Sequence, residues 1–230
     1  MDEVAIKDEF YRLIPSRFPP VAVYEGLVSE DKIEALVEIE NKTNPRLQSE
    51  SRLLSAHTDP RAPRLQNWNL APFKYLNPEG SRFFDGSRPA LELADDRQTA
   101  LAMSVERRQA FLSRTKEAPI GLDMRLLKTP VSGRFIDFRK YPIDLSCEER
   151  WRLGGSVPEG ADGVIYHPPE RPSAICIAVL RGDVLGRTIQ TVHYRYVWNG
   201  TRVSLLYAFD DAGNEIRPEV LCGADDAFAV

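Results

Sequence analysis

The chain has 230 residues and a formal net charge of −4, with 43% hydrophobic and 28% charged residues. These values are typical of one globular domain, and the acidic balance argues against a nucleic-acid-binding surface. The acidic N-terminus has no apolar signal region and no apolar run reaches the length of a membrane span, so we expect a cytoplasmic protein without membrane contacts.

The N-terminal third is rich in prolines. The apolar segment 10–24 predicts a short strand that runs into a turn, because Pro15 and the proline pair after it exclude a helix. A helix is predicted to follow, with Ser29 as its N-cap. Residues 44–82 contain five prolines and little periodicity, so they predict a long, loop-rich surface excursion.

The middle of the chain predicts a strand followed by a helix. The strand covers residues 90–94, and Asp95 is expected to cap the helix, with Gln98 completing a variant of the capping box. Hydrophobic residues at helical spacing predict the buried stripe of this helix. They are Leu101, Val105 and Leu112. The charged residues 106–108 would either line a site or form a solvent-exposed face.

The second half of the chain predicts mainly β-structure. Four apolar runs are expected to be strands, at 122–127, 134–138, 163–166 and 175–180. Ser146 and Glu149 form a capping box that opens a short helix. Residues 194–198 and 201–209 predict a hairpin turned at Asn199-Gly200, where both residues are expected to take positive φ. The residues after 210 have weak periodicity and predict a surface tail.

This order of elements predicts a single domain of mixed α/β (α+β) class. Only two clear helices separate the short β runs, which argues against a doubly wound parallel sheet. The three cysteines, Cys147, Cys176 and Cys222, form no close pair and the three histidines are isolated, so no metal site is predicted. Cys176 lies in an apolar run and is expected to be a buried strand residue.

Short catalytic signatures do not identify a reaction, because GxGxxG, Walker A, HExxH and GxSxG patterns are all absent. The sharpest polar cluster is 80–88, where Arg82 lies among glycines and serines. An arginine on such a loop can bind a phosphate, although a solvated loop with turn glycines explains the same residues. His167 is a candidate general base, but no partner carboxylate is identifiable for it.

Three segments stand out by their composition and order. The first is Phe10-Tyr-Arg-Leu-Ile-Pro-Ser-Arg-Phe-Pro-Pro20. The second includes Asn77-Pro-Glu-Gly-Ser-Arg-Phe-Phe-Asp-Gly-Ser87 and Leu93-Ala-Asp-Asp-Arg-Gln-Thr-Ala-Leu-Ala102, and the third includes Ala161-Asp-Gly-Val-Ile-Tyr166 and Tyr196-Val-Trp-Asn-Gly200. Together they resemble the long form of the RES domain, a family of bacterial NAD-consuming toxins. The resemblance covers about residues 10–205 of the chain.

The resemblance implies an ADP-ribosyltransferase-like fold, in which helices flank a central β-sheet core. RES toxins belong to bacterial toxin–antitoxin pairs: they degrade NAD or transfer its ADP-ribose, and a small helix-turn-helix antitoxin blocks the NAD pocket. NAD is therefore implied as substrate or ligand, and such an antitoxin as partner. The oligomeric state stays open, a homo-oligomer included.

The residues implied to bind NAD carry over in part. Arg12 matches the arginine of the family's YR motif and Arg82 that of its G-x-R-F/W motif; both suit a diphosphate, because a guanidinium pairs bidentately with phosphate oxygens. Tyr166 matches the tyrosine of the strand-end Y-x-S motif. An arginine commonly follows that serine; its position is Glu170 here, and Arg171 lies beside it.

Three catalytic positions depart from the family pattern. Met103 occupies the glutamate position of the helix motif, Pro168 the serine position, and Glu92 that of a strand tyrosine. Cleavage of the nicotinamide–ribose bond passes through an oxocarbenium-like state that a carboxylate stabilises, which methionine cannot do. Two relocated carboxylates are hypotheses for restoring catalysis: Glu92 itself, and Glu106, three residues after Met103 on the same helix.

These substitutions leave three functions open. The first is an NAD-consuming toxin with a relocated carboxylate. The second is a catalytically inactive relative that binds NAD, another nucleotide or a protein partner. The third is a decoy that keeps the family's antitoxin-binding surface without its pocket. Nicotinamide release from NAD separates an active from an inactive protein, and calorimetry with NAD separates a nucleotide binder from a protein–protein module.

Overall fold

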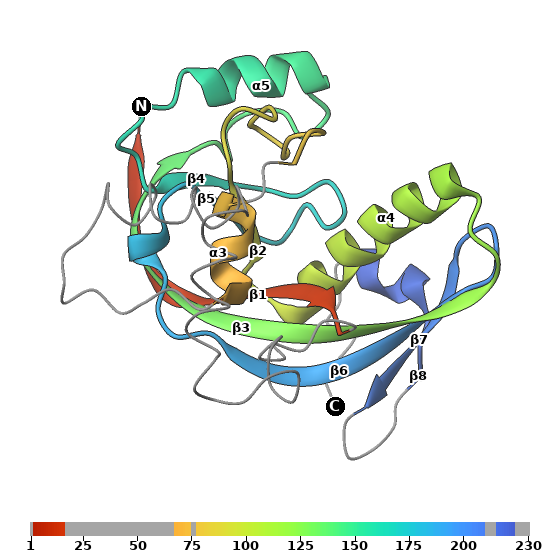
Figure 1. The fold of residues 1–230 in the computed structure, drawn as a ribbon. Helices are drawn as coiled ribbons and strands as arrows, with labels where there is room; N and C mark the ends of the chain where they lie inside the picture. Colours follow the sequence, from red (N-terminus) through yellow and green to blue (C-terminus); the bar gives the residue numbers. More distant parts are fainter. Residues whose placement is uncertain (1, 17–66, 75–76, 210–214, 224–230) are drawn as a thin grey trace, which may run out of the picture.

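The fold is mixed α+β, built around an eight-stranded sheet in the order β1-β2-β5-β4-β3-β6-β7-β8. The computed structural model describes residues 2–16, 67–74, 77–209 and 215–223 (Figure 1). Its strands are β1 (Glu3–Pro15), β2 (Leu91–Ala94), β3 (Ile120–Asp137), β4 (Gly163–Tyr166), β5 (Cys176–Val179), β6 (Ile189–Trp198), β7 (Val203–Phe209) and β8 (Glu215–Ile216). Its helices are α3 (Asn67–Lys74), α4 (Arg97–Thr115) and α5 (Cys147–Gly155), with 3₁₀ turns η1 (Gly182–Val184) and η2 (Pro218–Cys222).

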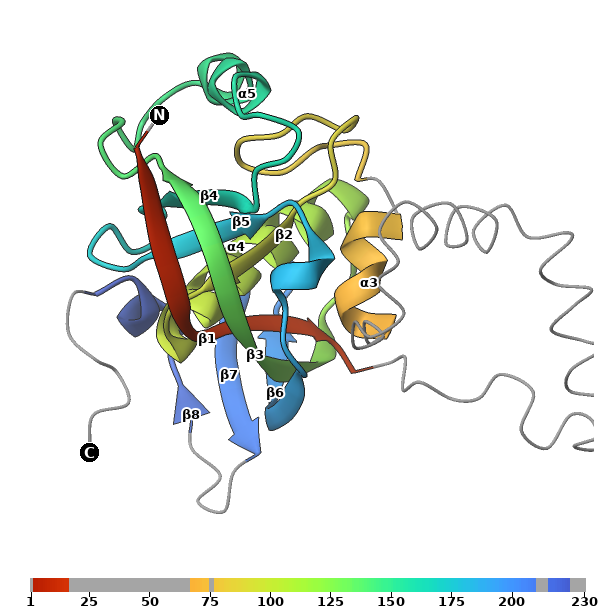
Figure 2. The same ribbon diagram turned by 90° about the vertical axis from the view of Figure 1, so that its left-hand side faces the viewer.

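Strands β1, β2, β5, β4 and β3 close into a ring, because β1 pairs with β2 as well as with β3. The long β1 and β3 strands lie side by side in Figure 2. Alternate residues of the ring strands pack into one core. They include Phe10, Leu91, Leu93, Phe135, Ile165, Ile177 and Val179. Glu92 lies between two of these residues and therefore faces the other side of β2, toward α4.

Helix α4 packs over the second and larger core, above the curve of β3 and β6 (Figure 1). The predicted stripe of this helix is confirmed, since Leu101, Val105 and Leu112 are all buried. Buried aromatic residues of β6 and hydrophobic residues of β3 and β7 complete the core. Within the described part of the chain no helix, α4 included, is long and apolar enough to cross a membrane.

Strand β3 corrects the prediction of two separate strands at 122–127 and 134–138. Pro130 and Gly133 interrupt the sequence pattern between them, but β1 pairs along this whole segment and keeps the backbone extended. The register shifts between residues 125 and 127, where β6 pairs with the opposite edge of β3. Such a bulge bends the strand, so that β3 can pair with β1 in one part of the sheet and with β6 in the other.

The other predicted strands of the first half need smaller changes. Strands β2, β4 and β5 lie within one residue of their predicted bounds. Strand β1 begins at Glu3, earlier than the predicted segment 10–24, because its pairing with β3 starts at that residue. The turn predicted after β1 and the helix predicted after Ser29 lie outside the described residues.

The start of α4 differs from the prediction by one residue. Asp96, not Asp95, is the N-cap: its carboxylate accepts a hydrogen bond from the Thr99 N–H at 2.8 Å. Asp95 instead accepts one from the Ile175 N–H at 3.0 Å, which ties the helix start to β5. The capping box predicted at Ser146 is present at the start of α5.

The β6–β7 hairpin is confirmed, but its turn is wider than predicted. Trp198 pairs with Val203, so residues 199–202 connect the strands. Gly200 takes a positive φ of 95°, whereas Asn199 does not. The Asn199 side chain instead accepts hydrogen bonds from the backbone N–H groups of residues 201 and 202. An asparagine that hydrogen-bonds the following backbone in this way needs no left-handed conformation.

Two segments predicted to be irregular contain regular structure. Helix α3 lies within the excursion 44–82, with Pro72 inside the helix. In the predicted tail, β8 pairs with β7 and η2 follows, with Leu221 fully buried. Gln98 of α4 donates to two carbonyl groups of η2, each at 3.1 Å. Tertiary contacts therefore fix this segment, which has little periodicity of its own.

Candidate functional site

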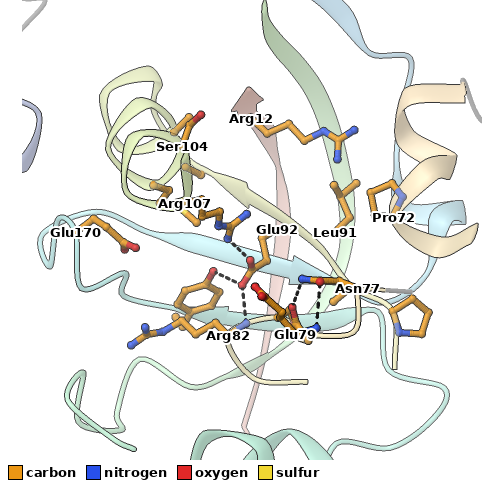
Figure 3. Close-up of a pocket in the computed structure, with 18 of the residues that line it drawn as sticks. Arg12, Pro72, Asn77, Glu79, Arg82, Leu91, Glu92, Ser104, Arg107 and Glu170 are labelled. Atoms are coloured by element: carbon orange, nitrogen blue, oxygen red, sulfur yellow. Dashed lines mark hydrogen bonds and ion pairs between the residues drawn. The ribbon is translucent and has the colours of Figure 1, made fainter. Parts of the chain in front are cut away.

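A cavity of about 520 Å³ is bordered by β2, α4 and the loop 77–90 (Figure 3). This volume falls within the roughly 300–1,000 Å³ of small-molecule and cofactor sites. Its lining includes the arginines Arg12, Arg82, Arg88, Arg107, Arg108 and Arg150 and the acidic residues Glu79, Asp85, Glu92 and Glu170. The surplus of guanidinium groups favours an anionic ligand, although the whole chain is acidic.

The loop after residue 76 is a folded turn that presents Arg82 to this cavity. The Asn77 side chain donates to the Gly80 carbonyl at 2.6 Å. Gly80 has a φ of 70°, and a Cβ there would lie 2.5 Å from the Phe84 carbonyl oxygen. Glycine is therefore required at this position, both for the conformation and for the close approach of the backbone. The next turn brings Arg82 to the pocket wall.

Arg82 packs against aromatic rings. Its guanidinium donates to the Ile143 carbonyl at 2.8 Å and lies 5.6 Å and 5.7 Å from the ring centres of Phe83 and Tyr166. Burial lowers the pKa of Arg82, but an arginine keeps its positive charge at physiological pH. Its Nε is buried and no described residue accepts a hydrogen bond from it. The side chain therefore keeps one unused donor.

The carboxylate of Glu92 is already bound by neighbouring protein groups. Its side chain is 6% exposed and forms an ion pair with Arg107 of α4. It also accepts hydrogen bonds from the Arg82 backbone N–H at 3.1 Å and from the Tyr166 hydroxyl at 3.3 Å. Figure 3 shows these groups converging on one carboxylate. Glu92 thus joins β2, β4, α4 and the Arg82 loop.

Tyr166, at the end of β4, is buried and lines the cavity. Its ring packs edge-on against Phe83 with the ring centres 5.0 Å apart. Burial, and then the negative charge of Glu92, raise the pKa of Tyr166 well above its ordinary value. The hydroxyl therefore stays protonated and donates to Glu92 at all ordinary pH values.

Met103 and Pro168, where the resemblance implies the family's glutamate and serine, are both apolar residues. Met103 is 8% exposed and lines the cavity, with its Sδ 3.4 Å from the Sγ of Cys176. Cys176 itself is buried, as predicted. Pro168 is buried and is not among the lining residues. Neither side chain offers a charged group or a strong hydrogen-bonding group to a ligand.

Arg12 reaches the cavity from β1, on the side of Pro72 (Figure 3). In that view the Glu92–Arg107 pair lies between Arg12 and Arg82. Burial, followed by the like charge of Arg107, lowers the pKa of Arg12 to about 10. Burial also lowers the pKa of Arg108; Tyr196 opposes this shift, and the like charge of Arg107, the smallest of the three influences, adds to it. An anion bound here would relieve the repulsion among these cations.

Glu170 is the other carboxylate near Arg82, and it comes from the loop after β4. In Figure 3 it lies at the left of the view, with Arg107 between it and Glu92. Burial raises the pKa of Glu170, while Arg107 and Arg82 lower it and Glu92 raises it further. Apart from its own backbone N–H, none of the described residues donates a hydrogen bond to its carboxylate.

Two residues implied to act on NAD lie away from the cavity lining. Arg171 donates to Asp96 at 2.9 Å and to the Gly223 carbonyl at 3.0 Å, so it clamps the start of α4 to the end of η2. Glu106 lies on an exposed part of α4, where its carboxylate contacts Gln109 at 3.5 Å. The structure therefore brings Arg12, Arg82, Glu92 and Tyr166 together, without these two.

His167 is also outside the lining, and its Nδ1 is 2.7 Å from the Ala174 carbonyl oxygen. That contact holds the loop between β4 and β5 and leaves no orienting carboxylate for a general base. Among the described residues, no three His, Cys, Asp or Glu side chains gather in a way that would hold a metal ion.

The sequence indicated only part of the basic lining. Residues 106–108 were predicted either to line a site or to face solvent, and the structure divides them: Arg107 and Arg108 line the cavity and Glu106 does not. Arg88 belongs to the predicted polar cluster 80–88, whereas Arg150 was not singled out; both donate to distant backbone carbonyls. No local pattern marks such residues, because their partners lie about 70 positions away in the chain.

A mixed α+β fold with an arginine-lined cavity defines a protein suited to an anionic ligand. Residues 58–199, more than half of the chain, match the sequence model of the RES domain. The chain therefore belongs to the RES domain family, as the three segments indicated. It is also 98% identical to a protein of Sinorhizobium fredii (strain NBRC 101917 / NGR234) called uncharacterized protein y4oC, over 230 residues and the full length of both chains.

Proposed function

We propose that this protein binds NAD in the arginine-lined cavity and cleaves its nicotinamide–ribose bond, as the resemblance to RES toxins implies. The observation that carries the proposal is the gathering of six arginines, from β1, α4, α5 and the Arg82 loop, around one cavity. A diphosphate carries two negative charges and presents several acceptor oxygens, which suit guanidinium groups better than a neutral ligand does.

The two family arginines have features that favour such a ligand. Burial and the charge of Arg107 lower the pKa of Arg12, and the Nε of Arg82 is a donor that no described residue accepts from. Bound phosphate oxygens would compensate both the loss of hydration and the mutual repulsion. We therefore assign Arg12 and Arg82 to the diphosphate, with Tyr166 as part of the wall beside it.

The reaction class follows from the bond that the family breaks. Departure of nicotinamide leaves positive charge on the ribose, and a carboxylate facing that charge stabilises the transition state. The released ADP-ribose would pass either to water or to an acceptor on another protein. In the family context, a helix-turn-helix antitoxin would bind over the cavity of this cytoplasmic toxin.

A second candidate is a catalytically inactive protein that binds NAD or another nucleotide. The substitution of the family glutamate by Met103 favours it, since the helix then offers no carboxylate at that point. The full engagement of Glu92 by Arg107, Tyr166 and the Arg82 backbone favours it too. This candidate predicts NAD binding without nicotinamide release.

Calorimetry with NAD and an assay of nicotinamide release test both candidates on the same purified protein. Arg82→Met should weaken NAD binding by roughly 10–100-fold, the range for a lost charge-assisted hydrogen bond. Arg134→Met is the matched control, because that side chain is 69% exposed and pairs with Glu3 on the surface. Equal NAD affinity of the two variants, or no NAD binding by the wild type, would contradict the assignment.

A further inference from the structure

We propose that Glu170 is the catalytic carboxylate of this protein, and that it faces the nicotinamide ribose and accepts the proton of the attacking water. This inference rests on the proposed cleavage of NAD in the same cavity. It assigns the chemistry to a residue at the family's arginine position, in place of the carboxylate that Met103 has removed.

The first argument is hydrogen-bonding capacity. Glu92 lines the cavity, but an ion pair and two hydrogen bonds hold its carboxylate in the wall. A carboxylate bound in this way would have to break those contacts before it could accept a proton. Glu170 lines the same cavity, and among the described residues only its own backbone N–H donates a hydrogen bond to its carboxylate. Its lone pairs are available to a ligand.

The second argument is the fixed position of the loop that carries Glu170. On one side, His167 is held by its contact with the Ala174 carbonyl, 2.7 Å away. Two prolines, residues 168 and 169, restrict the backbone between His167 and Glu170. On the other side, Arg171 is bound to Asp96 at 2.9 Å. The backbone is thus fixed from both sides, and among the described residues only the N–H of Glu170 itself donates a hydrogen bond to the carboxylate.

The third argument is the set of charges that face Glu170. Partial burial, the largest influence, opposes its ionised form, whereas its own backbone N–H, Arg107 of α4 and Arg82 of the loop before β2 favour that form and Glu92 on β2 opposes it. Cys222 of η2 is also close enough for its pKa to be raised by Glu170. The net result is a raised pKa, which makes this carboxylate a better proton acceptor than an exposed glutamate.

The step is balanced without any further reagent than water. The bond between ribose C1′ and the nicotinamide nitrogen breaks, and its electron pair goes to the nitrogen, which loses its positive charge. A water oxygen forms the new bond to C1′, and one water proton passes to Glu170 and then to solvent. The products are ADP-ribose, nicotinamide and one proton.

Glu170→Gln keeps the size of the side chain and removes the base. We expect nicotinamide release to fall by about 100-fold or more, the usual range for a lost general base. NAD affinity, measured by calorimetry, should stay the same or increase slightly, because a negative charge has left an anion-binding cavity. Glu170→Asp should keep part of the rate, since it retains a carboxylate on a shorter side chain.

Glu106→Gln is the matched control, because this acid-to-amide change lies outside the cavity lining. It should release nicotinamide at the wild-type rate.

If Glu170→Gln binds NAD and keeps a rate within about threefold of the wild type, well inside the 100-fold expected for a general base, Glu170 is not the base. Loss of NAD binding in Glu170→Gln also overturns the assignment, because it would make Glu170 a structural residue. A wild type that binds no NAD overturns the proposed function itself, and one that binds NAD without releasing nicotinamide overturns the cleavage and with it the role of Glu170.

Discussion

Two walls of the same cavity each carry a carboxylate, and the two carboxylates differ in how many hydrogen bonds and ion pairs they form. On the β2–α4 wall, Glu92 is 6% exposed and is held by Arg107, Tyr166 and the Arg82 backbone. On the wall formed by the loop after β4, Glu170 is fixed through its backbone while its carboxylate has only its own N–H. The difference teaches that a carboxylate in a pocket is chemically available only where the fold leaves its oxygens unused.

The comparison extends to the arginines. The resemblance implied that Arg171 and Arg82 both bind NAD. Arg171, however, donates hydrogen bonds to Asp96 and to the Gly223 carbonyl. Arg82 is anchored through one nitrogen and keeps Nε unused. A charged side chain that is completely paired supports the scaffold, and one that is partly paired can still bind a ligand.

The largest expected effect is a difference in protein stability between variants of the two carboxylates. Glu92→Ala should lower the free energy of unfolding by roughly 2–3 kcal/mol, because it leaves a buried hydroxyl, a backbone N–H and a guanidinium without their acceptor. Glu170→Ala should change it by less than about 0.5 kcal/mol, or raise it slightly at pH 7. Burial raises the pKa of Glu170, so its ionised form destabilises the fold above the ordinary pKa of 4.5. Urea denaturation at pH 7 measures both variants, and equal losses would contradict the comparison.

A similar contrast is expected for a structural and a surface arginine. Arg171 is 13% exposed, and Arg171→Met should cost about 2 kcal/mol, since it frees the start of α4 from η2. Arg134→Met, at a side chain that is 69% exposed, should cost less than about 0.5 kcal/mol. Thermal melting of the two variants checks the difference. A strong loss of NAD affinity in Arg171→Met, with unchanged stability, would instead restore Arg171 to the ligand site.

Asp95 is intermediate between Glu92 and Glu170, because its carboxylate is partly buried and accepts a hydrogen bond from one neighbouring backbone N–H, that of Ile175. Burial, opposed by the Ile175 N–H and reinforced by Asp96, raises the pKa of Asp95 to about 6. A raised pKa in the folded state means that its stabilising contribution is complete below pH 3.8 and is lost as the pH rises through 6. Asp95→Asn removes this loss and should be about 1 kcal/mol more stable than the wild type at pH 8. Denaturation at pH 8 and at acid pH measures this; an advantage that does not shrink on acidification would contradict it.

Much of the local structure could be predicted because short-range patterns determine it. The stripe of α4, the Ser146 capping box and strands β2, β4 and β5 all follow from the spacing of nearby residues. The single long β3 could not be predicted in this way, because β1, more than 100 positions away, keeps it extended. The ordered segment at 215–223 likewise depends on Gln98.

The site was predictable to the extent that family motifs mark it. The resemblance implied Arg12, Arg82 and Tyr166, and the structure places all three on one cavity. The roles of Arg171 and Glu92 depend on partners that lie 75 and 15 positions away, which no local pattern reveals. Glu170 was visible in the sequence only as a departure from a family arginine, and its availability is a property of the folded loop.

The most direct test of the central claim is nicotinamide release from NAD by the wild-type protein, followed from pH 4 to pH 8 (about the range over which a carboxylate of raised pKa titrates). We predict release that increases with pH as Glu170 ionises, in the range above the ordinary pKa of 4.5 because burial raises it. The groups facing Glu170, namely Arg107, Arg82, Glu92 and Cys222, set where that rise occurs. Bound NAD that yields no nicotinamide at any of these pH values would contradict the account.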